Sequence, residues 1–456
     1  MSLFEPYKQM VRHIQPLGVS GRVSAVRGLT VSVADFPAPI GAGCRVEGLA
    51  GAVEARVVGF ADQQTLVMPM GAMTGICQGA RVVLTTSRQS VAVGEAVLGR
   101  VLDGTGRPID ERGPLTTTAH MPIWPEPIAA MQRRRITAPL CTGVRAIDAL
   151  LTVGRGQRMG IFSGSGVGKS VLLGMIGRHT AADVTVIGLI GERGREVRDF
   201  IEKDLGPDGL TKSVVVVSTG DEPPLLRVQA GAVATAVAEF FRLRGADVVL
   251  LVDSLTRLAT AQRQIGLVAG EPPATRGYTP SVFNLLPQLL ERSGRTETGS
   301  ITAFYTVLAE GDDLSEPVTD AVRAVTDGHI HLSRELANRG HYPAIDCLSS
   351  VSRVMIDLVD QEHLAAAREL SRLMAVFAEV QDMVSIGAYK GGANKDYDLA
   401  IAAQPLIRSF LSQAVAEREQ FDATRGKLLD LHRRLEQIKR SLQSAGAARS
   451  GAGRNQ

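Results

Sequence analysis

The apolar residues nearest the N-terminus recur every three or four positions. They are Phe4, Tyr7, Val11 and Ile14, with charged residues between them. This spacing predicts a short amphipathic helix, which Pro16 and Gly18 end. We expect the helix, within residues 1–20, either to pack on its own domain or to dock on a partner protein or a membrane surface.

Residues 21–90 have a different pattern, in which short β-branched runs alternate with glycine-bearing turns. Closely spaced short strands of this kind predict a small β-barrel. The runs are Arg22–Val26, Leu29–Val33, Ala55–Phe60 and Thr65–Met68.

Residues 91–353 contain continuous apolar runs separated by helix-like stretches of ten or more residues. Continuous apolar strands alternating with helices indicate an α/β domain whose parallel sheet is covered on both faces. The expected strands are Arg158–Ser163, Val184–Ile190, Ser213–Ser218, Asp247–Asp253 and Ser300–Leu308.

Strand patterns stop after Val354, and residues 354–444 predict a helical domain. Two helices are expected over Gln361–Glu379 and Leu399–Leu411, followed by a third with apolar heptad spacing that suits a short coiled-coil arm. Residues 445–456 are rich in Gly, Ala, Ser and Arg, which predicts a disordered tail.

Composition narrows the class of protein without naming an activity. The chain has 456 residues, 45% of them apolar, and a nearly balanced charge of +3. No run of eighteen apolar residues and no secretory signal are present, so the cytoplasm is the expected location. Four scattered cysteines without a CxxC pair predict inert thiols and neither a metal site nor disulfides. They are Cys44, Cys77, Cys141 and Cys347.

An eight-residue segment between an apolar strand and an expected helix matches the phosphate-binding loop of nucleotide-binding proteins. Backbone N–H groups and the positive end of the helix hold phosphate oxygens in such loops. We expect Lys169 to reach the β- and γ-phosphates and Ser170 to ligate Mg²⁺. The usual pattern has glycine at position 163, and serine fits there if its φ is negative. The loop consists of Ser163, Gly164, Ser165, Gly166, Val167, Gly168, Lys169 and Ser170.

Two carboxylates follow other expected strands. Asp253 ends an apolar run downstream of the loop, where such an acid holds magnesium, usually through water. Glu192 follows the run Val184–Ile190, at the edge where parallel sheets bind ligands. A carboxylate there orients and polarises the attacking water, although a helix N-cap or a surface ion pair is the alternative. Together with the loop, these acids predict a magnesium-dependent ATPase.

Three more segments carry a family resemblance: Gly191–Val197 (GERGREV), Gly270–Phe283 (GEPPATRGYTPSVF) and Tyr342–Asp346 (YPAID). Together they resemble the rotary and secretion ATPase superfamily, which includes the catalytic β subunit of the F-type ATP synthase. Val167–Met175 and Gly270–Phe283 are most similar to the ATPases of type III protein export. Residues 387–401 resemble the flagellar branch more than the injectisome branch. The resemblance implies a RecA-like fold for the central domain.

The same resemblance implies roles for individual residues. Arg193 falls on a position near the nucleotide. Tyr342 falls on the tyrosine that packs on adenine, with a core or interface tyrosine as the alternative. Other aromatics of that adenine pocket have no clear counterpart, which leaves the base selectivity open. The family's loop lysine, metal hydroxyl, catalytic glutamate and metal acid fall on Lys169, Ser170, Glu192 and Asp253.

Arg353 resembles an arginine that the synthase's non-catalytic subunit lends to its neighbour. Here Glu192 and Arg353 lie on one chain, so a ring of identical subunits has complete interfaces. The resemblance therefore implies a homohexamer that hydrolyses ATP with Mg²⁺ to energise flagellar protein export. It implies a stator-like regulator bound through the N-terminal helix, a central stalk protein, export chaperones, a membrane export gate, and a cytoplasmic location with peripheral membrane contact.

Three rival functions are weighed against this one. The same machine could serve a virulence injectisome. A hexameric RNA translocase also joins a barrel to a nucleotide-binding core, but the barrel region offers only Phe36 and Phe60 for stacking, so no nucleic-acid partner is expected. A structural subunit without turnover is the third, and such subunits typically lack the carboxylate that Glu192 supplies.

Overall fold

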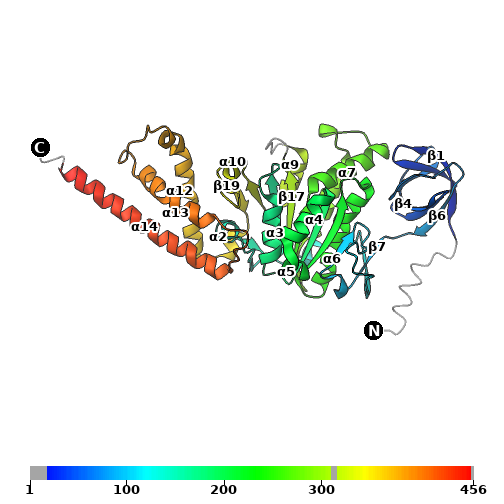
Figure 1. The fold of residues 1–456 in the computed structure, drawn as a ribbon, viewed down its shortest axis with the longest axis horizontal. Helices are drawn as coiled ribbons and strands as arrows, with labels where there is room; N and C mark the ends of the chain where they lie inside the picture. Colours follow the sequence, from blue (N-terminus) through cyan, green and yellow to red (C-terminus); the bar gives the residue numbers. More distant parts are fainter. Residues whose placement is uncertain (1–17, 310–315, 453–456) are drawn as a thin grey trace.

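The computed structural model describes residues 18–309 and 316–452, with side chains up to residue 444. Three parts lie in a row: a barrel, a central sheet domain and a bundle of helices from which the last helix projects (Figure 1). The amphipathic helix predicted near the N-terminus falls on residues 1–17, which lie outside the described ranges.

The described part of the N-terminal domain forms a closed six-stranded barrel with strand order β1-β2-β5-β4-β3-β6. Valines such as Val31, Val57 and Val82 fill its interior. Arg56 reaches from the barrel to Gln229 and joins it to the central domain. The strands are β1 (Ser20–Arg27), β2 (Thr30–Ala34), β3 (Gly43–Gly48), β4 (Gly51–Ala61), β5 (Gln64–Pro69) and β6 (Arg81–Thr86).

The central domain is built on a nine-stranded sheet, counted over the described ranges. The five predicted strands are confirmed, and two of them run slightly further than expected. Seven strands pair in parallel, and β19 and β16 pair antiparallel to their neighbours. In spatial order the strands are β19 (Ile345–Ser352), β18 (Gly328–Leu332), β12 (Arg158–Ser163), β17 (Ser300–Leu308), β15 (Asp247–Asp253), β13 (Val184–Glu192), β14 (Ser213–Thr219) and β8 (Val101–Asp103), with β16 (Gly294–Arg295) beside β17.

Helices cover both faces of this sheet, as the continuous apolar strands require. Helix α3 buries Leu172 and Ile176 on one face, and the alanine-rich α6 buries Ala234 and Val237 on the other. On the first side lie α2 (Arg145–Leu150), α3 (Lys169–His179), α4 (Gly194–Asp199) and α5 (Gly206–Thr211), and on the second α6 (Pro224–Leu243), α7 (Leu255–Val268), α8 (Pro280–Leu290) and α9 (Pro317–Val325). Two short helices, α10 (Arg334–Asn338) and α11 (Met355–Leu358), flank β19.

The C-terminal domain consists of α12 (Gln361–Ser385), α13 (Lys395–Leu411) and α14 (Phe421–Ala452). The heptad seam of α14 packs inside this chain, where Leu428, Leu431 and Leu435 join the core that continues from the sheet. The predicted disordered tail was wrong up to Ala452, because α14 continues that far. Its alanines have the highest helix propensity, and extending an existing helix avoids the cost of nucleation.

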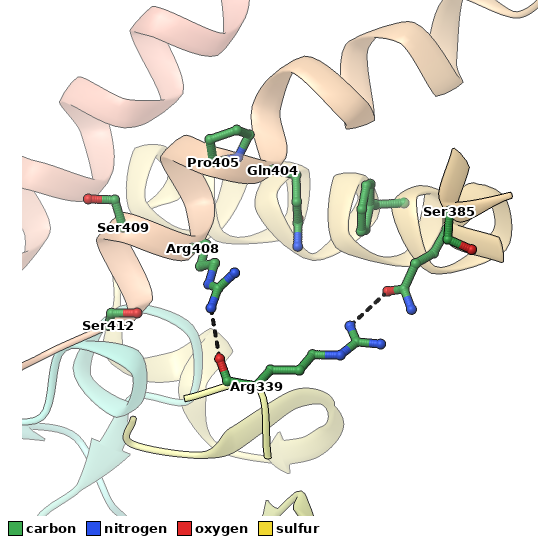
Figure 2. Close-up of a pocket in the computed structure, with 9 residues that line it drawn as sticks. Arg339, Ser385, Gln404, Pro405, Arg408, Ser409 and Ser412 are labelled. Carbon is green, nitrogen blue, oxygen red and sulfur yellow. Dashed lines mark hydrogen bonds between the residues drawn. The ribbon is translucent and has the colours of Figure 1, made fainter. Parts of the chain in front are cut away.

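A solvent-filled cleft of about 680 Å³ separates part of the C-terminal helices from the central domain (Figure 2). Arg408 of α13 donates to the Arg339 carbonyl at 2.9 Å, and the Arg339 guanidinium donates to Gln381 of α12 at 3.2 Å. On the packed side of this junction, the His363 ring nitrogen Nε2 lies 2.8 Å from the Ala149 carbonyl. The two domains thus pack against each other around Ala149 and leave an open cleft beside Arg339.

All four cysteines are free thiols, and burial raises the pKa of Cys44, Cys141 and Cys347 to about 12. No helix in the described ranges has the length and apolarity needed to span a bilayer.

Candidate active site

The phosphate loop joins β12 to α3 with the backbone that its glycines predict. Gly166 and Gly168 have φ values of 77° and 90°, a left-handed conformation that glycine adopts at little cost. A Cβ added at Gly166 would meet no atom within 4 Å, so the loop borders open space in which phosphate oxygens fit. Val167 is buried in the core and anchors the loop to the sheet. The φ of Ser163 is not positive, which is the condition for a serine to replace the usual glycine at this position.

Three charged side chains meet beside this loop: Lys169 at the start of α3 and two carboxylates at the carboxyl ends of strands. Lys169 pairs with Asp253, which ends β15, and its Nζ lies 3.6 Å from Oε1 of Glu192, which ends β13. The three side chains are between 4% and 11% exposed. The structure brings these three predicted residues together, and the low exposure strengthens their electrostatic interactions.

Asp253 is fixed from the neighbouring strand by Thr306 of β17. The Thr306 hydroxyl donates to Oδ1 of Asp253 at 2.7 Å and is fully buried. Sequence reasoning missed Thr306, because the contact spans 53 positions and a threonine in an apolar run carries no local signal.

Arg257 is a second residue that the sequence did not indicate. It lies in the first turn of α7, donates to the Gly191 carbonyl, and holds Oε2 of Glu192 at 2.9 Å. A Cβ at Gly191 would come within 2.9 Å of the Arg257 side chain, so glycine at this position permits the close approach. The only available signal was a cation four positions after Asp253, which is too common to single out.

The environment of Glu192 suits a general base at neutral pH. Burial raises its pKa to about 7, and a hydrogen bond to Glu196 and the negative charge of Asp253 act in the same direction. Lys169 and Arg257 oppose this rise. A base titrating near the working pH combines a sufficient deprotonated fraction with proton affinity.

This arrangement predicts how kcat/KM for ATP depends on pH. Protonated Glu192 donates to the Glu196 carboxylate, so this bond stabilises the protonated form. We expect kcat/KM to rise with pH around 7, because the base must be ionised. Glu196→Ala removes the bond, lowers the pKa of Glu192 and moves the rising limb to lower pH. The titration of ATP itself is the same in assays of the wild type and of Glu196→Ala. If the rising part of the pH profile does not move in Glu196→Ala, the assignment of Glu192 as the titrating base is contradicted.

The donor set near the loop fits a magnesium ion. Mg²⁺ is usually held by one or two carboxylates, waters and substrate phosphates, without a cage of protein ligands. The Asp253 carboxylate and the exposed Ser170 hydroxyl at the start of α3 provide such donors. No cluster of three or more His, Cys, Asp or Glu side chains able to hold a metal occurs within the described ranges.

Two residues with expected roles near the nucleotide differ in their placement. Tyr342 lies against the loop: a Cβ added at Gly168 would be 3.6 Å from its ring, which is half-exposed and accessible to a base. Arg193 lies outside the charged cluster, with its side chain 85% exposed and paired to Glu196 at 3.7 Å. It occupies the N-cap position of α4, and its partner Glu196 in turn hydrogen-bonds Glu192, so its role near the nucleotide stays a prediction.

Arg353 lies at the opposite end of the strands from this chain's own phosphate loop. Strand β19 runs antiparallel, so Ser352 pairs with Gly328, which aligns with Met159 near the start of β12. The loop follows the other end of β12, four residues on, or roughly 13 Å away at 3.3 Å per residue. Arg353 is exposed there and does not join the Glu192 cluster.

Comparison with known proteins agrees with this geometry. Residues 143–352 match the ATP synthase alpha/beta family, nucleotide-binding domain, and residues 359–430 match the T3SS EscN ATPase C-terminal domain. The flagellum-specific ATP synthase of Pseudomonas aeruginosa is 49% identical over 423 residues, which cover 91% of this chain and 94% of that one. The type 3 secretion system ATPase of Xanthomonas euvesicatoria is 49% identical over 406 residues, covering 89% and 92%.

A solved structure has the same architecture. The assembled ATPase EscN from the type III secretion system of enteropathogenic E. coli superposes with a TM-score of 0.86 and 41% identity, covering 90% of this chain and all of that chain.

The fold and the charged cluster define a RecA-like ATPase of the ATP synthase alpha/beta type. Within that class, the chain belongs to the family of type III protein-export ATPases, which comprises flagellum-specific ATP synthases and type 3 secretion system ATPases.

Proposed function

We propose that this ATPase works as a homohexameric ring that energises the export of flagellar proteins. The observation that carries the proposal is that Glu192 and Arg353 lie at opposite ends of the strands of one sheet. Glu192 ends β13, whereas Arg353 follows β19 beside the start of β12. In a head-to-tail ring, one surface of each subunit meets a different surface of the next. Every interface then combines Glu192 of one subunit with Arg353 of its neighbour.

In the proposed reaction, Lys169 and the loop N–H groups bind the β- and γ-phosphates of ATP. Glu192, held by Arg257, orients the attacking water and receives its proton. Asp253 and Ser170 hold the magnesium ion, which neutralises phosphate charge. The Arg353 of the next subunit stabilises charge on the transferred phosphoryl group, and Tyr342 packs on the base.

The proposed partners follow the domain order. EscN has been solved assembled and in complex with its central stalk EscO. By analogy, the C-terminal helices of this chain face a central stalk, chaperones and cargo, and the N-terminal residues bind a stator-like regulator. We propose that the ring works at the cytoplasmic face of the membrane, beside an export gate.

Relatives of both export branches are about equally similar, so the flagellar assignment depends on residues 387–401. In this segment Tyr389 donates to Asp398 at 2.9 Å, and the Gly392 N–H donates to the same carboxylate, which gives the loop a defined shape. The injectisome is the second candidate, supported by the Xanthomonas relative. The RNA translocase loses support because Phe36 is in the barrel core, which leaves Phe60 as the exposed phenylalanine of the barrel.

Replacing the chromosomal gene with Lys169→Ala tests the proposal. We expect the amount of flagellar hook and filament protein in the culture medium to fall sharply, because the loop lysine clamps the phosphates. Lys203→Ala, in which a 71%-exposed lysine is removed, is the matched control and should leave export intact. Normal flagellar export with loss of injectisome effectors would assign the chain to the other branch.

A further inference from the structure

Nine residues without regular structure connect α13 to α14, and they cross the central domain close to the nucleotide site. We call residues 412–420 the connector. Its contacts with the central domain include the segment that carries Tyr342, which lies beside the phosphate loop, and the far end of α3, the helix that follows the loop.

The first contact is with the segment that carries Tyr342. The Gln413 N–H donates to the Tyr342 carbonyl at 3.0 Å, and the Ser412 hydroxyl lies 3.1 Å from Nδ1 of His341. The Tyr342 ring in turn lies against Gly168. The connector therefore holds the backbone from which the proposed base-stacking ring extends.

The second contact is with α3, the helix that begins at Lys169. The Val415 carbonyl accepts a hydrogen bond from Arg178 at 3.0 Å and lies 3.2 Å from Nε2 of His179. Both residues are in the last turn of α3, where a positive charge such as that of Arg178 stabilises the helix. The connector thus joins the C-terminal end of α3 to the Tyr342 segment, which lies beside the N-terminal end of the same helix.

A single buried arginine fixes this connector. Arg145, the first residue of α2, donates to the Phe410 carbonyl at 2.8 Å and the Ser412 carbonyl at 3.2 Å. Its guanidinium also pairs with Glu419 at 2.7 Å and with Glu417. The Arg145 side chain is only 7% exposed, so these charge-assisted bonds are shielded from water.

The Arg145 backbone adds a further bond, since its N–H donates to Oε1 of Gln413 at 2.7 Å. The Gln413 amide nitrogen donates to the Gly143 carbonyl at 2.8 Å, and Gln413 is 5% exposed. The same glutamine whose N–H bonds to Tyr342 is therefore held at both its amide oxygen and its amide nitrogen by residues at and just before the start of α2. The planar guanidinium binds several acceptors at once, a geometry that lysine does not reproduce.

We propose that Arg145 is a positioning residue for nucleotide binding: its side chain holds the connector on both sides of Gln413, at Ser412 and at Glu417 and Glu419, and so sets where the Gln413 N–H meets the Tyr342 carbonyl beside the phosphate loop. The inference rests on the proposed role of Tyr342 in stacking on the base. Arg145 itself contacts neither the phosphate loop nor Glu192 through any described bond, so its effect is on affinity for the base and not on the chemical step.

The test compares ATP with tripolyphosphate, which has the phosphates but no base. For Arg145→Gln we expect KM for ATP to rise about tenfold, equivalent to about 1.4 kcal/mol, with kcat within twofold of wild type. Inhibition by tripolyphosphate should be unchanged. Arg145→Lys should lose less affinity than Arg145→Gln, because lysine keeps the positive charge but cannot donate to several acceptors at once as the planar guanidinium does.

Two further variants make the result decisive. Glu417→Gln weakens the same network at a side chain that is 38% exposed, so it is the variant to use if Arg145→Gln does not fold. It should raise KM in the same direction by a smaller factor. Arg372→Gln is the control, since Arg372 joins α12 to α13 through Glu369 and Asp396 and has no described bond to the connector or the central domain. Its KM should be that of wild type.

Tyr342→Ala separates the two possible failures. If Tyr342→Ala leaves KM for ATP unchanged, the base does not stack there, and the proposed role of Tyr342 fails. If Tyr342→Ala raises KM but the Arg145 and Glu417 variants do not, the positioning inference is overturned. Equal loss of ATP and tripolyphosphate binding, or a fall in kcat without a change in KM, would also overturn it.

Discussion

Glu192→Gln is expected to bind ATP with nearly wild-type affinity while its hydrolysis rate falls about 10²–10⁴-fold, the usual contribution of a general base. The amide has almost the same shape as the carboxylate but is a poor base. Its side chain can still accept the hydrogen bond from Arg257, so the site should keep its shape.

Lys169→Ala should differ from Glu192→Gln in a diagnostic way. It removes the charge that binds the β- and γ-phosphates, so we expect both nucleotide binding and hydrolysis to be lost. It also leaves Asp253 and Glu192 without the ammonium group between them, which increases repulsion between the acids.

Calorimetric ATP titration and a phosphate-release assay on the same preparations measure both effects. Glu202→Gln removes the same charge from an exposed helix position and serves as the control. Turnover of Glu192→Gln at the wild-type rate would show that Glu192 has only a structural role.

The parts of the fold that the sequence predicted are those with strong local signals. The five inner strands are continuous apolar runs because they are buried on both faces, and β12 and β15 begin and end at the predicted residues. The phosphate loop was identifiable because its glycines are required by backbone geometry at Gly166 and Gly168.

The parts that were missed depend on long-range contacts or on weak patterning. Strand β19 is an edge strand with partly exposed serines, so it has no apolar run. Thr306 and Arg257 act on Asp253 and Glu192 only after the strands have been brought together. The resemblance placed Arg193 near the nucleotide, but the local geometry at the start of α4 directs its side chain to solvent.

Arg353→Ala is expected to bind ATP and to assemble, yet to be nearly inactive. Its position at the opposite end of the strands from its own phosphate loop motivates the proposal that it acts on a neighbour's nucleotide. An arginine supplied across an interface increases the rate about 10³–10⁵-fold, or about 4–7 kcal/mol.

The specific activity of the wild type should accordingly rise with protein concentration and reach a plateau as rings form. Arg433→Ala, at a 72%-exposed position of α14, is the control for loss of an arginine and should behave as wild type. A specific activity independent of concentration down to the monomer would contradict the requirement for a neighbour.

Mixing the two inactive variants tests the shared site most directly. In rings assembled from equal amounts of Glu192→Gln and Arg353→Ala subunits, about one interface in four joins an intact Glu192 to an intact Arg353 of the next subunit. We therefore expect the phosphate-release rate to recover to about a quarter of the wild-type value, from nearly zero for either variant alone. If native mass spectrometry finds mixed rings and the rate stays at the level of the separate variants, the shared-site account is wrong and Arg353 is structural.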